Sequence, residues 1–256
     1  MQKYKLHIKT CNKYLYSNII LLKNRMIIVN KYFILMGDIK DSRKENPERL
    51  SSIMMEMIIH AEEKFNEDRL SKLEIKIGDD FQVVMKDIHS LLDILLYLDI
   101  YLKKNNIECR FTLGYGTISG NINKYKHSEM IGSGLTNVNE ILNKKDKKYS
   151  FYIEDEIYKT ILLNIIGLLL EDCLSNLTKK QIEFLYNKIV MDKDFAEIER
   201  IMGVKQRAVY DYSKRSKYLL IMDVFEKIEF SFMDNIKSLE NIYLKGLRLD
   251  KGIYFE

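Results

Sequence analysis

Apolar and polar positions alternate with two different periods along the first half of the chain. Three segments indicate β-strands. Residues 27–36 are rich in β-branched and aromatic residues, residues 73–85 begin with an apolar alternation and end in a second apolar run, and residues 107–117 have a clear two-residue period. Two segments have the spacing of helices buried on one side: residues 47–65 and 87–104. The second strand segment contains Gly78-Asp79-Asp80, which predicts a tight hairpin turn between two short strands.

The resulting order is strand, helix, strand, strand, helix, strand. It predicts a ferredoxin-like α+β domain, in which helices cover one face of an antiparallel sheet and the other face remains open to a ligand. Gly114 and Gly116 lie on one face of the last strand. We assign them to the open face, where missing side chains let a bulky ligand approach.

The rest of the chain is predicted to contain mostly helices. We expect a loop over residues 118–134, a helix over 137–143, a strand over 149–153 and a buried apolar helix over 154–170. From Leu177 onward the sequence becomes polar, helical and basic. The predicted organisation is an N-terminal extension, an α+β domain and an all-α domain: residues 1–26, 27–175 and 176–256.

Composition restricts the classes of function. The chain has 256 residues, of which 46% are hydrophobic and 30% charged, as in soluble globular proteins. Its longest apolar run is about half of the roughly 20 residues that a membrane span needs, so we expect no membrane partner. The net charge of +4 permits a nucleic-acid partner without requiring one. Cys11, Cys109 and Cys173 are far apart, which favours free thiols in the cytoplasm over disulfides or a zinc site.

Acidic residues stand where strands of this topology end. Asp38 follows the first strand, and Asp79 and Asp80 lie in the hairpin turn, which is its neighbour in a ferredoxin-like sheet. Together with the backbone carbonyl of Ile39 they make an oxygen-only site for Mg²⁺ or Mn²⁺, which would in turn hold phosphates. The alternative is that Asp38 caps a turn and that Asp79-Asp80 is an inert hairpin turn, because aspartate is common in turns.

Two motifs resemble those of known families. Gly37-Asp-Ile-Lys-Asp-Ser42 and Gly78-Asp-Asp-Phe-Gln82 are similar to motifs of the SatD family and, more distantly, of class III nucleotide cyclases and of GGDEF and polymerase-palm domains. The resemblance spans about residues 29–142. It implies a nucleotide-binding domain in which Asp38 and Asp79 hold a metal ion. The nucleotide-binding residues that we predict are Asp41, Ser42, Gly78, Gly114, Gly116, Asn137 and Asn139.

The chain departs from the cyclase pattern in one helix. In active cyclases this helix carries an Asn for the ribose and an Arg for the transition state. Asn137 or Asn139 matches the first requirement. Glu140, Ile141 and Leu142 stand where the Arg is expected. Loss of that charge lowers the rate of phosphoryl transfer by orders of magnitude, so we expect binding with weak or no turnover.

The second half of the chain contains a helix-turn-helix pattern at residues 195–217. Apolar residues surround Gly203 with the required spacing, and the segment resembles region 4 of sigma factors. The N-terminal half of the second helix would read the major groove of double-stranded DNA, and its end would contact phosphates. The predicted DNA-binding residues are Lys205, Gln206, Arg207, Tyr210, Lys214 and Arg215. The alternative is a basic, solvated helix in a helical bundle.

The apolar segment 219–232 needs a partner surface, which favours a homodimer. We therefore predict a cytoplasmic, transcription-regulator-like DNA-binding protein whose cyclase-like domain binds a nucleotide and a metal ion. Two other classes stay open: a divergent nucleotidyl cyclase or nucleotidyltransferase with two metal ions, and a non-catalytic interaction module. The missing Arg argues against the first, and the retained Asp38, Asp79 and Asp80 argue against the second.

Overall fold

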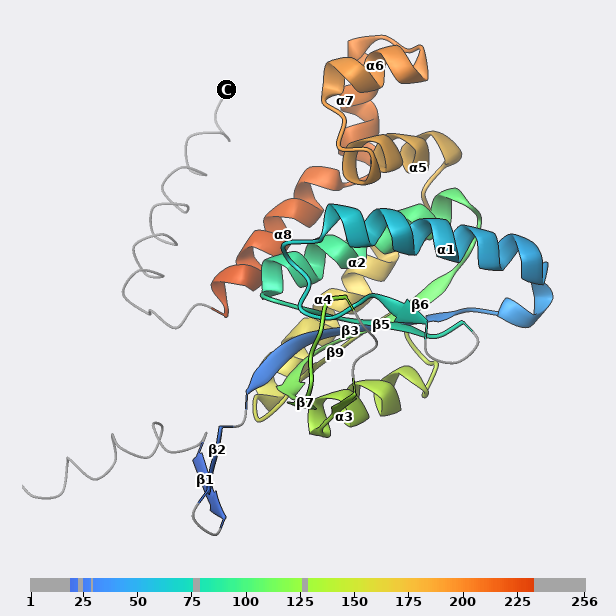
Figure 1. Ribbon diagram of the computed structural model, residues 1–256. Helices are drawn as coiled ribbons and strands as arrows, with labels where there is room; N and C mark the ends of the chain where they lie inside the picture. The colour runs from blue at the N-terminus through green and yellow to red at the C-terminus, as the bar shows by residue number, and fades with distance from the viewer. Residues whose placement is uncertain (1–18, 23–24, 29, 76–78, 126–128, 233–256) are drawn as a thin grey trace, which may run out of the picture. The chain divides into compact units, whose positions relative to one another are not determined.

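The computed structural model describes residues 19–22, 25–28, 30–75, 79–125 and 129–232 (Figure 1). The chain folds as two compact units, Met1–Ser175 and Asn176–Glu256. The first contains a five-stranded sheet with helices, and the described part of the second contains helices alone.

The central sheet has the strand order β4-β5-β3-β6-β9. Its strands are β3 (Lys31–Ile39), β4 (Glu74–Ile75), β5 (Phe81–Met85), β6 (Cys109–Thr117) and β9 (Tyr149–Ile153). β3 lies in the middle and runs antiparallel to both β5 and β6, whereas β9 joins β6 in parallel. The first four strands have the order and direction of the predicted ferredoxin-like arrangement, and β9 extends it. Asp38 lies inside β3, one residue before its end, instead of after the strand.

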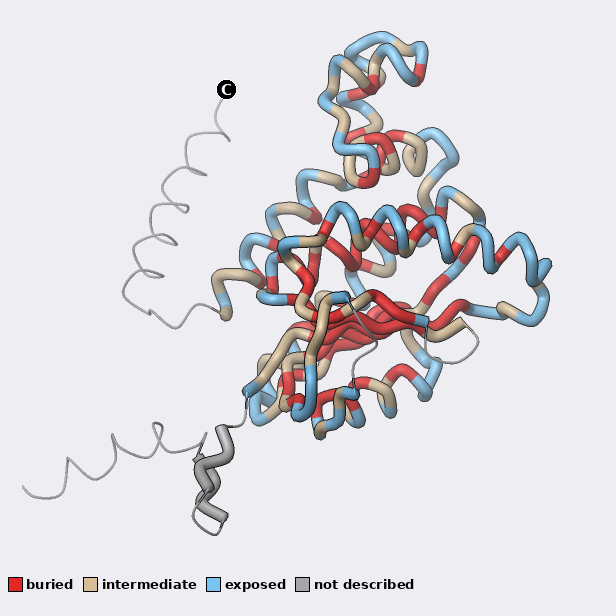
Figure 2. Tube along the Cα trace, viewed as in Figure 1, coloured by how far each residue is buried: buried red, intermediate tan, exposed pale blue. Residues whose placement is uncertain are grey.

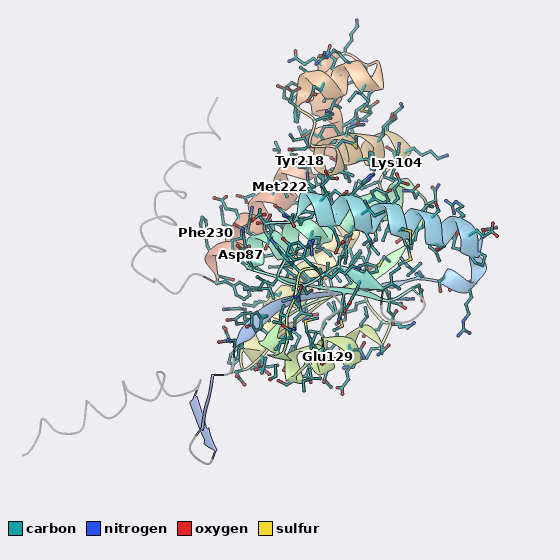
Figure 3. The ribbon with its side chains drawn as sticks, viewed as in Figure 1. Asp87, Lys104, Glu129, Tyr218, Met222 and Phe230 are labelled. Atoms are coloured by element: carbon teal, nitrogen blue, oxygen red, sulfur yellow. The ribbon has the colours of Figure 1, made fainter. Side chains whose placement is uncertain are left out.

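Two helices cover one face of this sheet. They are α1 (Pro47–Lys64) and α2 (Ile88–Lys104), and Figure 1 shows both on the same side. Each begins where a polar side chain accepts a backbone hydrogen bond: Asn46 from the Arg49 N–H at 3.0 Å, and Asp87 from the Ser90 N–H at 2.8 Å. Figure 3 labels Asp87 and Lys104 at opposite ends of α2. Most residues of β3 and all residues of β5 are buried beneath these helices (Figure 2).

The opposite face is not open, and here the sequence-based prediction is wrong. It is covered by α3 (Ser133–Leu142), which begins four residues earlier than expected. Leu135, Val138 and Leu142 of α3 pack with Ile34 and Met36 of β3. The helix approaches so closely because β6 has glycines there. A Cβ atom on Gly114 would lie 2.2 Å from Val138 Cγ2, and one on Gly116 would lie 2.7 Å from Gly134 Cα.

The edge strand β9 is protected by α4 (Ile157–Ser175). Asn164 accepts a hydrogen bond from the Phe151 N–H and donates one to the Phe151 carbonyl, and Thr160 does the same for Ile153. These side chains satisfy the backbone groups that an edge strand leaves unpaired. The helix was expected to be buried, but only its strand-facing residues are. The large apolar residues that it exposes are Ile157, Tyr158, Ile161, Leu162, Ile165, Leu168 and Leu169.

Smaller elements complete the first unit. A two-stranded ladder joins β1 (Ile19–Leu22) to β2 (Arg25–Ile28). Another joins β7 (Ser119–Gly120) to β8 (Met130–Ile131), within the segment that was expected to be a loop. A single 3₁₀ turn, η2 (Ser42–Lys44), connects β3 to α1.

The second unit is built around a chain of aromatic rings. Its helices are α5 (Lys179–Leu185), the π-helix η3 (Tyr186–Val190), α6 (Phe195–Met202), α7 (Gln206–Arg215) and α8 (Tyr218–Phe230). The ring of Phe184 lies 5.8 Å from that of Phe195, which lies 5.1 Å from that of Tyr210, so α5, α6 and α7 are packed together. No single helix in the described part of the chain is long and apolar enough to span a membrane.

We predict that Gly114→Ala lowers the free energy of unfolding by about 1–3 kcal/mol, because the added methyl group overlaps Val138 and forces α3 off the sheet. Urea unfolding followed by circular dichroism measures this loss. The double variant Gly114→Ala/Val138→Ala supplies the control. It should be more stable than the sum of the two single losses predicts, and simple additivity would show that the clash is not the cause.

Candidate functional site

Three carboxylates meet at one end of the central sheet. Asp38 lies in β3, and Asp79 and Asp80 immediately precede β5, whose first residue Phe81 pairs with Gly37. One oxygen atom from each of the three carboxylates lies within 4.8 Å of the others. The close packing of the two motifs sets this position, because a Cβ atom on Gly37 would lie 2.2 Å from the Phe81 ring. The glycine and the phenylalanine therefore align the acidic residues beside them.

Burial and neighbouring negative charge both act on the pKa of Asp80. Burial is the largest effect, and the neighbouring Asp38 and then Asp79 add to it, so that the pKa of Asp80 is raised above its usual value. The positive charge of Lys145 acts in the opposite direction but is outweighed. Negative charge therefore exceeds positive charge around Asp80, and additional positive charge would stabilise the cluster.

Two cations of the chain already contact the most buried carboxylate. The Asp38 side chain is only 4% exposed, and each of its oxygens contacts one cation: Arg110 Nη1 lies 2.9 Å from Oδ2, and Lys145 Nζ lies 2.9 Å from Oδ1. Arg110 stands directly opposite Asp38 in the β3–β6 pairing and is 19% exposed. Lys145 comes from the loop between α3 and β9, and its side chain is 51% exposed.

The loop that carries Lys145 is anchored at both ends. Before it, Leu142 is buried in the core under α3. After it, the buried Lys148 pairs with Asp99 at 2.8 Å and with Glu108 at 3.3 Å. Burial lowers the pKa of Lys148, but the two carboxylates outweigh burial and raise it, so this lysine stays charged. The position of Lys145 is thus fixed by the folded core on either side.

A cavity of about 530 Å³ adjoins the carboxylates and shares Asp79 with them. Apolar side chains of α1 and β4 form part of its wall, and Arg43 and Glu45 contribute charge. The lining residues are Ser42, Arg43, Glu45, Pro47, Leu50, Ser51, Met54, Ile75 and Asp79. Its volume is within the range of pockets that hold small organic ligands.

The donor set fits a divalent cation that prefers oxygen. Mg²⁺ and Mn²⁺ are typically bound by carboxylate oxygens together with water and phosphate, and here three carboxylates lie close together. Burial and the two neighbouring carboxylates raise the pKa of Asp80, so the positive charge of a metal ion would stabilise its ionised form. Neither histidine nor cysteine belongs to the cluster among the described residues, so the ligands do not suit zinc or copper.

The structure brings together part of the predicted site. Asp38, Asp79 and Asp80 form the cluster, and Ile39 follows Asp38 as the last residue of β3. Ser42 lines the adjoining cavity. The exposed Asp41 has left-handed backbone angles and pairs with Lys44 at 3.2 Å. Gly78 falls outside the described residues.

Other predicted residues lie elsewhere. Gly114 is four positions from Arg110 along β6, which corresponds to about 13 Å at the rise of a strand, and Gly116 is farther still. Both are covered by α3, so their role is helix packing instead of ligand approach. Asn137 donates a hydrogen bond to the Tyr152 hydroxyl at 2.8 Å, and Tyr152 pairs with Gly114 in the sheet. Asn139 lies half-buried near the end of α3.

Sequence reasoning missed the two cations. Arg110 had a detectable signal, because strand alternation and the expected β3–β6 pairing place it opposite Asp38 on the same face. Lys145 had none, since it is one lysine among several in a polar loop. Only the path of α3 across the sheet brings this loop to Asp38.

In the second unit, a tight turn separates α6 from α7. Gly203 has a φ of +62°, and the Val204 N–H donates to the Glu199 carbonyl at 3.2 Å, which closes the end of α6. Ile198 and Val209 are fully buried on either side of this turn. The predicted DNA-contacting residues are all exposed: Lys205, Gln206, Arg207, Tyr210, Lys214 and Arg215. The ring of Tyr210 also packs against Phe195.

Comparisons with known proteins agree with the motifs. The sequence model of the SatD family matches residues 32–153, a segment that includes both acidic motifs, residues 37–42 and 78–82. No curated protein gives a significant match. One similar solved structure is the adenylyl cyclase CyaB from P. aeruginosa, with 15% identity over 52% of this chain and 81% of that chain and a TM-score of 0.39. The guanylyl cyclase Cya2 has 12% identity over 45% of this chain and 71% of that chain, with a TM-score of 0.33. A bacterial light-regulated adenylyl cyclase has 11% identity over 48% of this chain and 43% of that chain, with a TM-score of 0.37. Likenesses this distant leave the function to be argued from the residues themselves.

We predict that Asp80→Asn stabilises the metal-free protein at pH 8. The raised pKa means that the ionised carboxyl destabilises the folded state above that pKa, and that this penalty disappears below the unfolded value near 4. The gain in melting temperature measured in EDTA should therefore shrink as the pH is lowered from 8 to 4. A gain that is independent of pH would exclude charge crowding as its cause.

Proposed function

We propose that the first unit binds a nucleotide through its phosphates and a divalent metal ion, and that the second unit binds double-stranded DNA. The observation that carries the first part is the meeting of Asp38, Asp79 and Asp80 within 4.8 Å, next to a cavity of about 530 Å³. Mg²⁺ or Mn²⁺ at these oxygens would bridge the carboxylates to phosphate oxygens.

Charge balance supports an anionic ligand. Three ionised carboxylates and the two cations Arg110 and Lys145 sum to −1 (−3 + 2), and a divalent ion changes this to +1 (−1 + 2). The metal-loaded cluster thus attracts negative charge, and phosphate groups are ligands that both the metal and the cations bind well. The cavity beside Asp79 then receives the remainder of the nucleotide against Pro47 and Leu50.

Phosphoryl transfer is the second candidate, and we rank it lower. Residues 140–142 of α3 offer no arginine, and Arg110 is engaged with Asp38 on the strand. A site that binds metal and phosphate while its arginine is committed to Asp38 favours retention of a ligand over turnover. The first unit then acts as a nucleotide or metal sensor within a regulator of transcription.

The proposed DNA contact rests on one feature of the second unit. Two helices flank the turn at Gly203, and all six candidate residues of α7 and its N-cap are exposed, four of them positively charged. A helix of this kind fits the major groove when its N-terminal residues reach base edges. Exposed Leu219 and Leu220 at the start of α8 support the homodimer that such readers use to bind paired half-sites.

We predict that Mn²⁺ with a nucleoside triphosphate raises the melting temperature by about 5 °C or more at concentrations near 100 times the dissociation constant. Asp79→Ala removes a ligand that is only half-buried, so the protein stays folded and the shift is lost. Glu56→Ala, which removes an exposed acidic residue from α1, is the matched control and keeps the full shift. Identical melting of wild type with and without these ligands would refute metal and nucleotide binding.

We predict that Arg207→Ala weakens binding to duplex DNA by about 5- to 150-fold, because a base contact by arginine contributes about 1–3 kcal/mol. Lys214→Ala should instead reduce the salt dependence of binding, since it removes a phosphate contact. Mobility-shift titrations at several salt concentrations measure both. Lys227→Ala on α8 is the control, being exposed, basic and outside the candidate surface. Absence of salt-sensitive DNA binding by wild type contradicts this part of the proposal.

A further inference from the structure

The Lys145–Asp38 ion pair is built into a site that a metal ion also needs. Both oxygens of Asp38 are occupied, one by Arg110 and the other by Lys145, each at 2.9 Å. A divalent ion shared by Asp38, Asp79 and Asp80 would take a lone pair of Asp38. Its charge would repel the cations that this carboxylate already holds, so the more mobile cation is expected to move away.

The two cations differ in how readily they leave. Arg110 lies on β6, directly paired with Asp38, and its side chain is only 19% exposed. Lys145 stands on a loop with its side chain 51% exposed. Its long, flexible side chain can move its ammonium group without a change in the backbone, whereas moving Arg110 requires a half-buried strand residue to rearrange. Lys145 is therefore the cation that is displaced.

The loop conformation supports a role for this residue. Lys145 has a φ of +56°, in the left-handed region that residues with a side chain rarely adopt. Its N–H donates to the Leu142 carbonyl at 3.1 Å, and the buried Lys148 anchors the other side of the loop. The core thus holds an unfavourable backbone conformation at the residue whose ammonium group reaches the metal-binding carboxylate.

We propose that Lys145 is an exchangeable counter-ion of the site. In the metal-free protein it neutralises Asp38, and in the metal-loaded protein it moves to the phosphate that the metal holds. The displaced ammonium group starts 2.9 Å from an oxygen that would ligate the metal, so the metal-bound phosphate lies within reach of the lysine side chain. The same residue then opposes binding of the metal alone and favours binding of the metal with phosphate, which makes the two ligands cooperative. This inference rests on the proposed function, and it attributes the cooperativity between the metal ion and the phosphate to Lys145.

The test is a comparison of two lysine variants by Mn²⁺ titration, with free Mn²⁺ followed by its paramagnetic resonance signal. Lys145→Met should bind Mn²⁺ alone about 3- to 10-fold more tightly, because a competing ion pair and a repelling charge are gone. The affinity of the Mn²⁺-loaded variant for inorganic triphosphate, measured by calorimetry, should fall by roughly 10-fold because a charged phosphate contact is lost. Lys144→Met makes the same charge change one residue away, without a contact to Asp38 among the described interactions, and should leave both affinities within about 2-fold.

The outcomes separate this inference from the proposed function. Wild type that binds Mn²⁺ and triphosphate, while Lys145→Met behaves like Lys144→Met, overturns the exchange of Lys145 and leaves the function standing. Weaker binding of both Mn²⁺ and triphosphate to Lys145→Met also overturns it. Failure of wild type to bind Mn²⁺ at all overturns the proposed function itself. Melting curves in EDTA, recorded for each variant, establish that all three proteins are folded.

Discussion

The charge of Asp38 is the constraint on which the rest of the first unit depends. A carboxylate inside the central strand and 4% exposed is stable only with compensation, because removing an unpaired charge from water costs several kcal/mol. Arg110 supplies part of it from the adjacent strand, and Lys145 supplies the rest from a distant loop. Asp79 and Asp80 add further negative charge nearby. The five charged side chains thus leave a net negative charge at the site, which attracts a further cation.

The helix α3 connects this electrostatic requirement to the packing of the domain. Its close approach to the sheet requires glycine at positions 114 and 116, where any side chain would collide with the helix. The same approach brings the end of α3 and the following loop to Asp38. Lys148 then fixes that loop through a buried pair with Asp99. Packing on one face of the sheet therefore determines which cation the carboxylates meet.

The second unit differs from the first because its core is small and its candidate binding surface is polar and exposed. Phe184, Phe195, Ile198 and Val209 hold α5, α6 and α7 together around the turn at Gly203. The basic residues of α7 have no part in this core. They are exposed instead, and the proposed DNA contact rests on this exposure and on their positive charge.

The sequence by itself determined the elements and their order. Strand-type and helical patterns placed most of the strands and helices to within a few residues. The strand order implied that Asp38 and the hairpin turn would be neighbours. These are local signals, carried by residues close together in the chain. The tertiary structure alone decided that α3 closes the second face, that glycine serves packing there, and that Lys145 pairs with Asp38. The reason is physical: the partner of a buried charge is set by which distant segment the fold brings within about 3 Å, and no local pattern encodes that distance.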